Sequence, residues 1–460
     1  MRREREKRSS RRDDARRLVQ RLAVTGIMLA AGSAYAGNVD TFGIGSRATA
    51  LGGAYAATAD DPFAAYYNPA GLTQIKSATI TAGAHLLAPS MQANDLGATA
   101  AAGGTAPAGS TLIPPTNVDD RSDVMAVPHL GFAMPINNRL AVGLAAYVPW
   151  GLDIKWSSSD PAAYSSSHSW YNRIVLTPTV AYKITDQLSV GAGISLGRSE
   201  SGDEHYLFAG SPTGPAGQFQ NWKIKTQLVD DLNWSYNLGV MYKPFTPLTL
   251  GVTYRSRTET NFKGTTEVSG FPVAGSPINQ KVNTSVSVDH PQQVQVGVRY
   301  QPIKTVSMEL DYVWTNWSII DSYTAHFSAP LVVLGGATSK TYARNWNDTN
   351  QIRIGVEWQA LEWLALRGGY FYDPSPVPDT TFDLTWPDAD KKTYSLGAGF
   401  KMGKHLTLDT VVQYTYAEQK RQIGGESVNL NAMTGAAPSQ ASVNANGQLW
   451  GGGLTFTYTF

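Results

Sequence analysis

Fourteen segments of this sequence alternate apolar and polar side chains, and the connections between them are by turns short and long. Successive side chains of a β-strand point to opposite faces, so each segment predicts a strand with one apolar and one polar face. Short turns at one rim, long loops at the other and an even strand number are typical of a bacterial outer-membrane barrel. A soluble β-sandwich has no reason to segregate its loops in this way.

The predicted strands form an all-β, 14-stranded antiparallel barrel. They cover residues 77–87, 124–135, 139–148, 171–184, 187–198, 230–242, 247–263, 285–300, 305–318, 348–358, 362–373, 391–402, 405–420 and 446–460. The last of them ends in an aromatic residue with no tail behind it, and Leu449–Phe460 is expected to pair with Ser77–Leu87 and close the wall.

Charged residues in these segments identify the face that points to the lumen. In the segment 247–263, one parity holds Leu248, Leu250, Val252, Tyr254 and Phe262, and the other holds Arg255, Arg257, Glu259, Asn261 and Lys263. A charge that faces lipid at the midplane costs about 2–4 kcal/mol, so the charged parity is predicted to face inward. The same argument places further charges in the lumen, either as structural ion pairs or as ligand contacts: Glu309, Asp311, Arg353, Glu357, Arg367 and Asp409.

The N-terminus predicts export. An Arg-rich segment from Arg2 to Arg21 precedes an apolar run from Leu22 to Ala31, which is shorter than the roughly 20 residues of a membrane-spanning helix. Ala34-Tyr35-Ala36 matches a signal-peptidase site, so residues 1–36 are predicted to be a signal peptide. The paired arginines also permit a twin-arginine signal, but acidic residues follow the first pair.

Composition excludes several functions. Removing ten basic and four acidic residues with the signal peptide leaves 27 basic and 32 acidic ones, a formal charge of −5 that gives no reason to expect nucleic-acid binding. The absence of cysteine excludes disulfides, thiolate metal sites and cysteine catalysis. Seven histidines are scattered without metal-ligand spacing, and no cofactor is expected.

Residues 37–76 fit no strand pattern. Asp61-Pro62 predicts the start of a short helix through Phe63–Tyr67, because Asp can cap free amides and Pro suits the first helical position. The segment is either a periplasmic extension or a plug in the lumen, and its low polarity favours the plug. We therefore expect a hatch at residues 37–76 and a barrel at residues 77–460.

Several short motifs resemble the FadL/TodX family of outer-membrane transporters. The first is Gly53-Ala54-Tyr55, followed by Ala59-Asp60-Asp61 and then Asn68-Pro69-Ala70-Gly71-Leu72. The others follow in the family's order: Tyr147-Val148-Pro149-Trp150-Gly151-Leu152, Gly251-Val252-Thr253-Tyr254-Arg255-Ser256, Asp311-Tyr312-Val313-Trp314-Thr315-Asn316-Trp317-Ser318, Leu366-Arg367-Gly368-Gly369-Tyr370 and Pro387-Asp388.

The resemblance implies passive uptake of hydrophobic compounds, such as long-chain fatty acids or aromatic hydrocarbons, through a hatch-closed barrel. It also implies a lateral exit, where a kink in the third strand faces the hatch turn Asn68, Pro69 and Ala70. In this chain the third strand ends in Pro149, Trp150 and Gly151, and Pro and Gly both weaken a strand. Pro149 has a simpler explanation as the end of the strand.

Candidate ligand contacts are apolar loop residues and inward arginines. A groove is expected among residues of the loops after strands five and seven: Leu207, Phe208, Phe219, Trp222, Phe271 and Val273. The alternative is that these side chains pack their own loops. Phe42 is expected near an inner pocket, and Arg255 and Arg257 are inward candidates for binding a carboxylate.

Two other functions remain alternatives. A general porin would have an open lumen, which the expected hatch opposes. A hydrolase would use Gly193-Ile194-Ser195-Leu196-Gly197, but Ser195 falls within an alternating strand and not at a strand-to-helix turn. The expected location is the outer membrane of a Gram-negative bacterium, where a monomer contacts lipid and lipopolysaccharide and the C-terminal Phe460 serves the barrel-assembly machinery.

Overall fold

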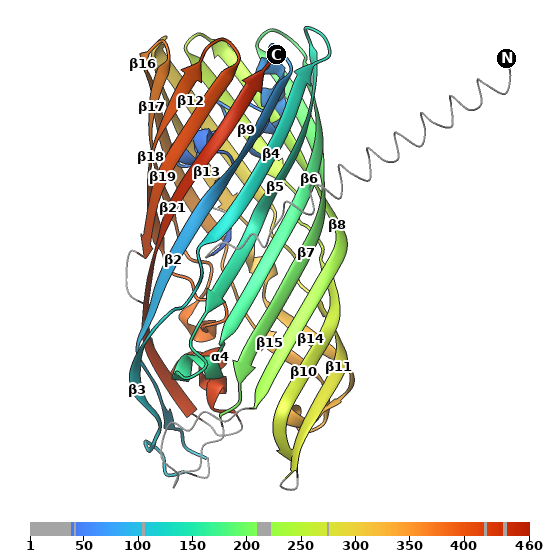
Figure 1. Cartoon of the computed structure of the whole chain (residues 1–460), viewed down its shortest axis with the longest axis vertical. Helices are drawn as coiled ribbons and strands as arrows, with labels where there is room; N and C mark the ends of the chain where they lie inside the picture. Colours follow the sequence, from blue (N-terminus) through green and yellow to red (C-terminus); the bar gives the residue numbers. More distant parts are fainter. Residues whose placement is uncertain are drawn as a thin grey trace, which may run out of the picture.

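The computed structural model describes residues 38–40, 43–103, 106–208, 222–273, 276–417, 421–435 and 439–460. Fourteen antiparallel strands close into one barrel, which stands upright in Figure 1. These strands are β2 (Thr79–Ala100), β4 (Met125–Pro135), β5 (Leu140–Lys155), β6 (His168–Lys183), β7 (Leu188–Tyr206), β8 (Lys223–Phe245), β9 (Leu248–Arg255), β12 (Gln293–Ile303), β13 (Val306–Thr315), β16 (Thr349–Leu361), β17 (Leu364–Asp373), β18 (Lys391–Met402), β19 (Leu406–Ala417) and β21 (Ser439–Thr459). The predicted signal peptide lies outside the described residues.

The last strand closes the barrel against the first, as the sequence predicts. Strand β21 pairs with β2 from Thr79↔Thr459 to Ala100↔Ser439. The short turns lie at one end, with the C-terminus, and longer loops extend the other end (Figure 1). In an outer-membrane barrel these are the periplasmic and the extracellular ends, respectively.

Side chains alternate between lipid and lumen along the strands. On β13, Leu310 and Tyr312 are 51% and 43% exposed, whereas Glu309 and Asp311 are buried. The other charges predicted to face inward on neighbouring strands, Arg353, Arg367 and Asp409, are also buried. The predicted orientation of these strands is therefore confirmed.

Several predicted strands were wrong in extent. Strands β2, β5, β7, β8 and β21 run beyond their predicted segments toward the extracellular end, and β5 continues through Pro149 to Lys155, so Pro149 does not end the third strand. Two other predicted strands are broken. The segment 247–263 contains a break, because β9 ends at Arg255 and β10 (Asn261–Val273) belongs to an extracellular hairpin with β11 (Ser276–Ser287). Phe262, predicted to face lipid, is consequently buried inside the structure. The segment 285–300 is similarly divided between β11 and β12. Period-2 alternation continued through both breaks, so it could not reveal them.

Shorter elements add to the extracellular end. They are β3 (Thr111–Asp119), β14 (Ser322–Leu331), β15 (Ala337–Ala343), β20 (Arg421–Gly424), α4 (Val428–Asn431), η2 (Pro161–Tyr164), η3 (Trp317–Ile319), η4 (Val332–Leu334), η5 (Asp379–Thr381) and η6 (Ala432–Thr434). Most of the buried apolar side chains of these elements join Trp150 and Leu152 of β5 in one large cluster, whereas Leu331 of β14 belongs to a separate one.

Residues 43–76, here called the luminal segment, lie within the barrel. They contain α2 (Ser46–Ala50), α3 (Ala64–Tyr67) and η1 (Pro69–Gln74). Helix α2 contacts β17, β18 and β19, and η1 contacts β5 to β8 on the other side. Of the helices in the described ranges, none has the length and apolarity to cross a membrane.

Candidate functional site

A network of ion pairs ties the luminal segment to the wall. Arg47 of α2 pairs with Glu357 of β16 at 3.0 Å and with Asp60. Glu357 also accepts from Arg367 at 2.6 Å, and Arg367 pairs with Asp409 at 2.6 Å. Three of the inward charges, Glu357, Arg367 and Asp409, thus form structural ion pairs, one of the two alternatives that the sequence left open. Arg353 instead donates to Gln351 Oε1 at 2.6 Å.

Two wall carboxylates hold the backbone of the luminal segment. Asp311 accepts hydrogen bonds from the backbone N–H groups of Tyr55 and Ala56, both at 3.0 Å. Glu309 accepts one from the N–H of Ala57 at 2.6 Å. Each intramolecular hydrogen bond contributes about 0.5–1.5 kcal/mol, and a buried N–H group without a partner would cost more, so these contacts together fix the segment in one position.

Close approach between backbones completes this packing. A Cβ added to Gly369 of β17 would come within 2.1 Å of the amide nitrogen of Gly52. A Cβ on Gly251 of β9 would come equally close to the carbonyl oxygen of Ala56. Any larger side chain at Gly369 or Gly251 would therefore push the luminal segment away from the wall.

Asn68, Pro69 and Ala70 form a turn against β7 and β8. The Asn68 side chain is fully buried, donates to the carbonyl oxygens of Ala56 and Val240, and accepts from Ala70 N–H at 3.1 Å. Gly239 lies beneath the turn, because a Cβ there would come within 2.1 Å of Asn68 Oδ1. This turn anchors the luminal segment to the wall, and its predicted role in gating stays a prediction.

The predicted helix after Asp61 begins slightly later, at Ala64. Asp61 accepts from the N–H of Phe63 at 2.8 Å and from the hydroxyl of Tyr55 at 2.9 Å. Burial raises the pKa of Asp61 to about 6, against the opposing influence of Arg47. The sequence did not predict helix α2.

We expect the substitution Glu357→Gln to loosen the luminal segment by about 2 kcal/mol, because Arg47 and Arg367 each lose a charged acceptor. Limited proteolysis followed by mass spectrometry should show faster cleavage within residues 43–76. Glu267→Gln is the matched control, since Glu267 forms an exposed ion pair with Lys281. Equal cleavage rates in the two variants would contradict the role of Glu357.

The wall is interrupted between β4 and β5 next to the predicted opening. The two strands pair from Pro135↔Ala141 to Leu130↔Ala146 and no further. Pairing between β5 and β6 is also irregular between Tyr147 and Trp150, where Pro149 lies. We call residues 125–129 of β4 and 147–154 of β5 the β4–β5 break.

The β4–β5 break is closed at its extracellular end and covered by neighbouring parts of the chain. A bridge between Asp120 and Trp156 closes its extracellular end. The short strand β1 (Asn38–Asp40) pairs with β5 at Trp150 and Gly151, where β4 no longer does. Val148 of β5 packs with Met125 and Val127 of β4 in one buried cluster. Side-chain packing therefore replaces backbone pairing at this place.

An inner cavity lies beside the β4–β5 break. It has about 440 Å³ of empty space and is lined by Tyr66 of the luminal segment and by Pro149 and Trp150 of β5. Its basic residues are Arg173 of β6 and Arg255 of β9. Pro149, Trp150 and Arg255, which the sequence analysis singled out, thus line one cavity together. The sequence analysis did not identify Arg173 as a site residue, although it lies in a predicted strand.

Both arginines of the inner cavity are held by neutral groups. Arg173 is 3% exposed and donates to Asn233 Oδ1 at 2.8 Å and to Ser235 Oγ at 3.3 Å. Arg255 donates to the side-chain oxygens of Gln293 and Gln295 and to Tyr66 O, and it stacks on the Tyr66 ring at 4.5 Å. No carboxylate of a described residue forms an ion pair with either arginine.

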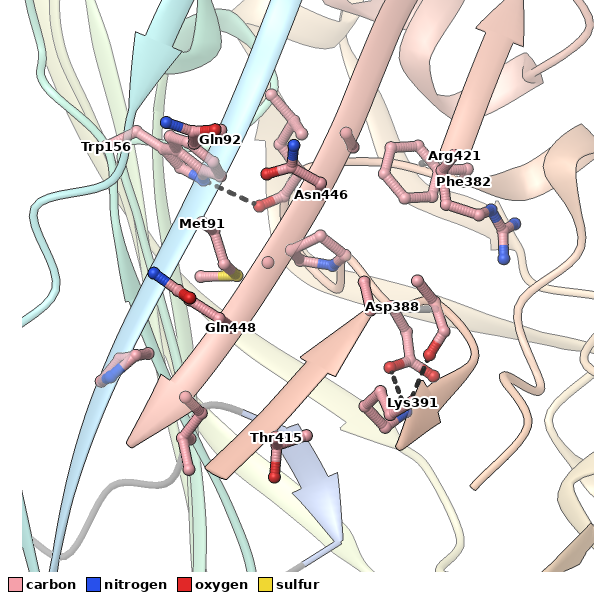
Figure 2. Close-up of a pocket in the computed structure, with 18 residues that line it drawn as sticks. Met91, Gln92, Trp156, Phe382, Asp388, Lys391, Thr415, Arg421, Asn446 and Gln448 are labelled. Atoms are coloured by element: carbon pink, nitrogen blue, oxygen red, sulfur yellow. Dashed lines mark hydrogen bonds and ion pairs between the residues drawn. The ribbon is translucent and has the colours of Figure 1, made fainter. Parts of the chain in front are cut away.

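Two further cavities continue toward the extracellular end. The middle cavity is lined by Trp317, Trp346 and Trp386, and Trp317 contacts Trp150 of the inner cavity edge to face at 5.5 Å. The outer cavity, shown in Figure 2, has about 620 Å³ of empty space and lies between β2, β19, β21 and the loop 374–390. Its basic residues are Lys391 and Arg421.

The predicted groove residues pack elsewhere. Trp222 contacts Phe271 edge to face at 5.5 Å, and Leu207 and Phe271 flank one buried cluster of the extracellular hairpins. Phe208 contacts Tyr164 at 5.2 Å. These residues line none of the three cavities, and a ligand groove on them stays a prediction. Phe42 and Phe219 lie outside the described residues, as does the side chain of Val273.

The prediction that Arg257 faces the lumen was wrong. It lies beyond the end of β9, pairs with Asp289 and has a side chain that is 52% exposed. Ser195 lies inside β7, and its hydroxyl is 2.8 Å from that of Thr177. Because it is not at a strand-to-helix turn, it lacks the geometry of a hydrolase nucleophile.

A closed outer-membrane barrel with a luminal segment and a series of cavities that combine aromatic and basic side chains fits a transporter of hydrophobic compounds. The chain belongs to the outer membrane protein transport protein family (OMPP1/FadL/TodX), whose family model matches residues 22–460. It is therefore an outer-membrane protein, as the sequence predicts.

Relatives match over nearly the whole chain. Outer membrane protein P1 of Haemophilus influenzae is 25% identical over 96% of this chain and 99% of its own length. The long-chain fatty acid transport protein of Escherichia coli K12 is 24% identical over 89% of this chain and 92% of its own. Among solved structures, a Pseudomonas aeruginosa FadL homologue covers 92% of this chain and 98% of its own, with a TM-score of 0.75 and 19% identity. The P. putida toluene transporter TodX covers 92% and 99%, with a TM-score of 0.68 and 14% identity.

Proposed function

We propose that this protein takes up long-chain fatty acids passively across the outer membrane, with the carboxylate held in the inner cavity. The buried Arg173 and the half-buried Arg255, neither of which pairs with a carboxylate of a described residue, carry this proposal. A guanidinium in a buried site is costly without a counter-ion, and a ligand carboxylate supplies one through strong charge-assisted hydrogen bonds. Neutral aromatic hydrocarbons, the other substrate class suggested by the family, supply no such charge.

The middle cavity suits the acyl chain of such a ligand. An acyl chain gains about 0.8 kcal/mol for each CH₂ group removed from water, and tryptophan faces line the middle cavity. We infer that the ligand moves from the outer to the middle to the inner cavity, and then leaves sideways through the β4–β5 break into the membrane. The luminal segment acts as the hatch that keeps water and ions from following.

Binding to the purified protein tests the carboxylate site. We expect Arg173→Met to weaken the binding of a long-chain fatty acid by roughly thirtyfold or more, the effect of about 2 kcal/mol. Affinity for the fatty alcohol of equal length should change little. Displacement of a fluorescent fatty acid, or quenching of tryptophan fluorescence, measures both ligands.

Arg257→Met is the matched control for this experiment, because Arg257 is exposed and lines none of the three cavities. If the wild-type protein binds acid and alcohol equally and Arg173→Met changes neither affinity, the inner cavity does not recognise a carboxylate and the proposed binding site is contradicted.

We further propose that uptake involves no chemical step and that the barrel works as a monomer. Apolar side chains around the wall face outward, which suits contact with lipid and with the acyl chains of lipopolysaccharide. Phe460, the terminal aromatic residue, is proposed as the signal for the barrel-assembly machinery.

A further inference from the structure

A short piece of the loop 374–390 separates the outer cavity from the middle one. Pro387, Asp388 and Lys391 line both cavities, so they form the partition between them. Figure 2 shows Asp388 and Lys391 side by side, across the outer cavity from Met91 of β2 and Gln448 of β21. The direct route between the two cavities therefore runs past these side chains.

An ionic cluster keeps this partition closed. Lys391 Nζ lies 2.6 Å from Asp388 Oδ1 and 3.4 Å from Asp373 Oδ2, and it donates to Ala389 O at 3.1 Å. The three charged side chains are between 9% and 15% exposed. Two carboxylates therefore share one ammonium group in a site with little water.

Asp388 is the member of this cluster that can leave. Asp373 is also held by Gln351 Nε2 at 2.7 Å, whereas Lys391 is the only ion partner of Asp388 within the described ranges. When Asp388 moves away, Asp373 and Lys391 remain as a balanced pair. Removal of Asp373 instead would break an additional hydrogen bond.

The rest of the loop is fixed. Asp383 pairs with the buried Arg344 at 2.7 Å, and the Trp156 indole donates to Leu384 O at 3.2 Å. On the other side of the partition, Asp390 accepts from Ser375 N–H at 2.8 Å and from the Tyr372 hydroxyl. A movement limited to the residues around Asp388 can therefore join the two cavities without unfolding the loop.

We propose that Lys391 determines specificity at this partition, which opens when a ligand carboxylate replaces Asp388 on Lys391. The exchange keeps two carboxylates on Lys391, because the ligand takes the place that Asp388 leaves as its side chain turns toward the wider, outer cavity. A neutral ligand has no carboxylate that could replace Asp388 on Lys391, so it stays in the outer cavity. This inference rests on the proposed uptake of fatty acids and adds a selective step before the inner cavity.

Transport by the intact protein, reconstituted in lipid vesicles, tests this inference. The quantity to measure is the ratio of uptake rates for a long-chain fatty acid and the fatty alcohol of equal length. We expect Asp388→Asn to raise the uptake rate of the alcohol about tenfold, because the charge-assisted contact between Asp388 and Lys391 that closes the partition is lost. The uptake rate of the acid should stay the same. Lys391→Met should lower uptake of the acid and raise that of the alcohol.

Asp388→Asn is the deciding variant because it leaves the Lys391–Asp373 ion pair intact. Glu267→Gln is the matched control, because it removes one carboxylate from an exposed ion pair with Lys281. Heat-modifiable migration on gels confirms that each barrel is folded. An unchanged acid-to-alcohol ratio in folded Asp388→Asn would overturn the inference, provided that the wild type transports the acid. If the wild type transports no acid, the proposed function itself is contradicted.

Discussion

Joining the two sides of the β4–β5 break with a covalent bond should abolish uptake while binding to the cavities persists. Val127 of β4 and Val148 of β5 lie in the same buried cluster across the break. The chain contains no cysteine, so Val127→Cys and Val148→Cys introduce the only two thiols. Oxidation or a short thiol-reactive linker would prevent the strands from separating, and we expect uptake of a labelled fatty acid to fall to the background level.

Reduction of the cross-link should restore uptake in the same sample. The matched control places cysteines at Phe132 and Leu144, which are register partners where β4 and β5 already pair. A cross-link at these positions joins strands that are already hydrogen-bonded and leaves the β4–β5 break free to open, so uptake should continue. Full uptake by completely cross-linked Val127→Cys/Val148→Cys protein would exclude lateral exit at this place and favour release into the periplasm.

Removing residues 37–76 should convert the closed barrel into an open pore. The deletion takes away the groups that cover Glu309, Asp311, Glu357 and Arg255, so water can solvate these charges and fill the lumen. The closed ring of backbone hydrogen bonds does not depend on the luminal segment, and we therefore expect the barrel to remain folded. Selective uptake should be lost at the same time.

Conductance in planar bilayers measures this effect. The intact protein is expected to show no steady conductance, and the deletion variant should show stable open-pore steps and admit small sugars to liposomes. Glu357→Gln, which keeps the segment but weakens its attachment, should give only brief openings. Identical conductance with and without residues 37–76 would show that the segment does not close the lumen.

The barrel is largely a local property of the sequence. Period-2 alternation acts on each strand separately, and the cost of placing charge in lipid fixes which side of β13, with Glu309 and Asp311, points inward. The same rule could not detect the end of β9 at Arg255, because alternation continues into β10 and only the change of pairing partner marks the break. Arg257 and Phe262 were misplaced for this reason.

What the sequence determined by itself was therefore the strand order and the inward face of strands such as β13. It left open whether Pro149 weakens the third strand or ends it. Only the tertiary structure decided that β5 loses β4 as its neighbour beyond Ala146 and that Arg173 and Arg255 meet in one cavity. It also decided that Lys391 lies between two cavities. Whether an inward charge finds a partner depends on residues that converge from distant strands and loops, and no local pattern encodes that convergence.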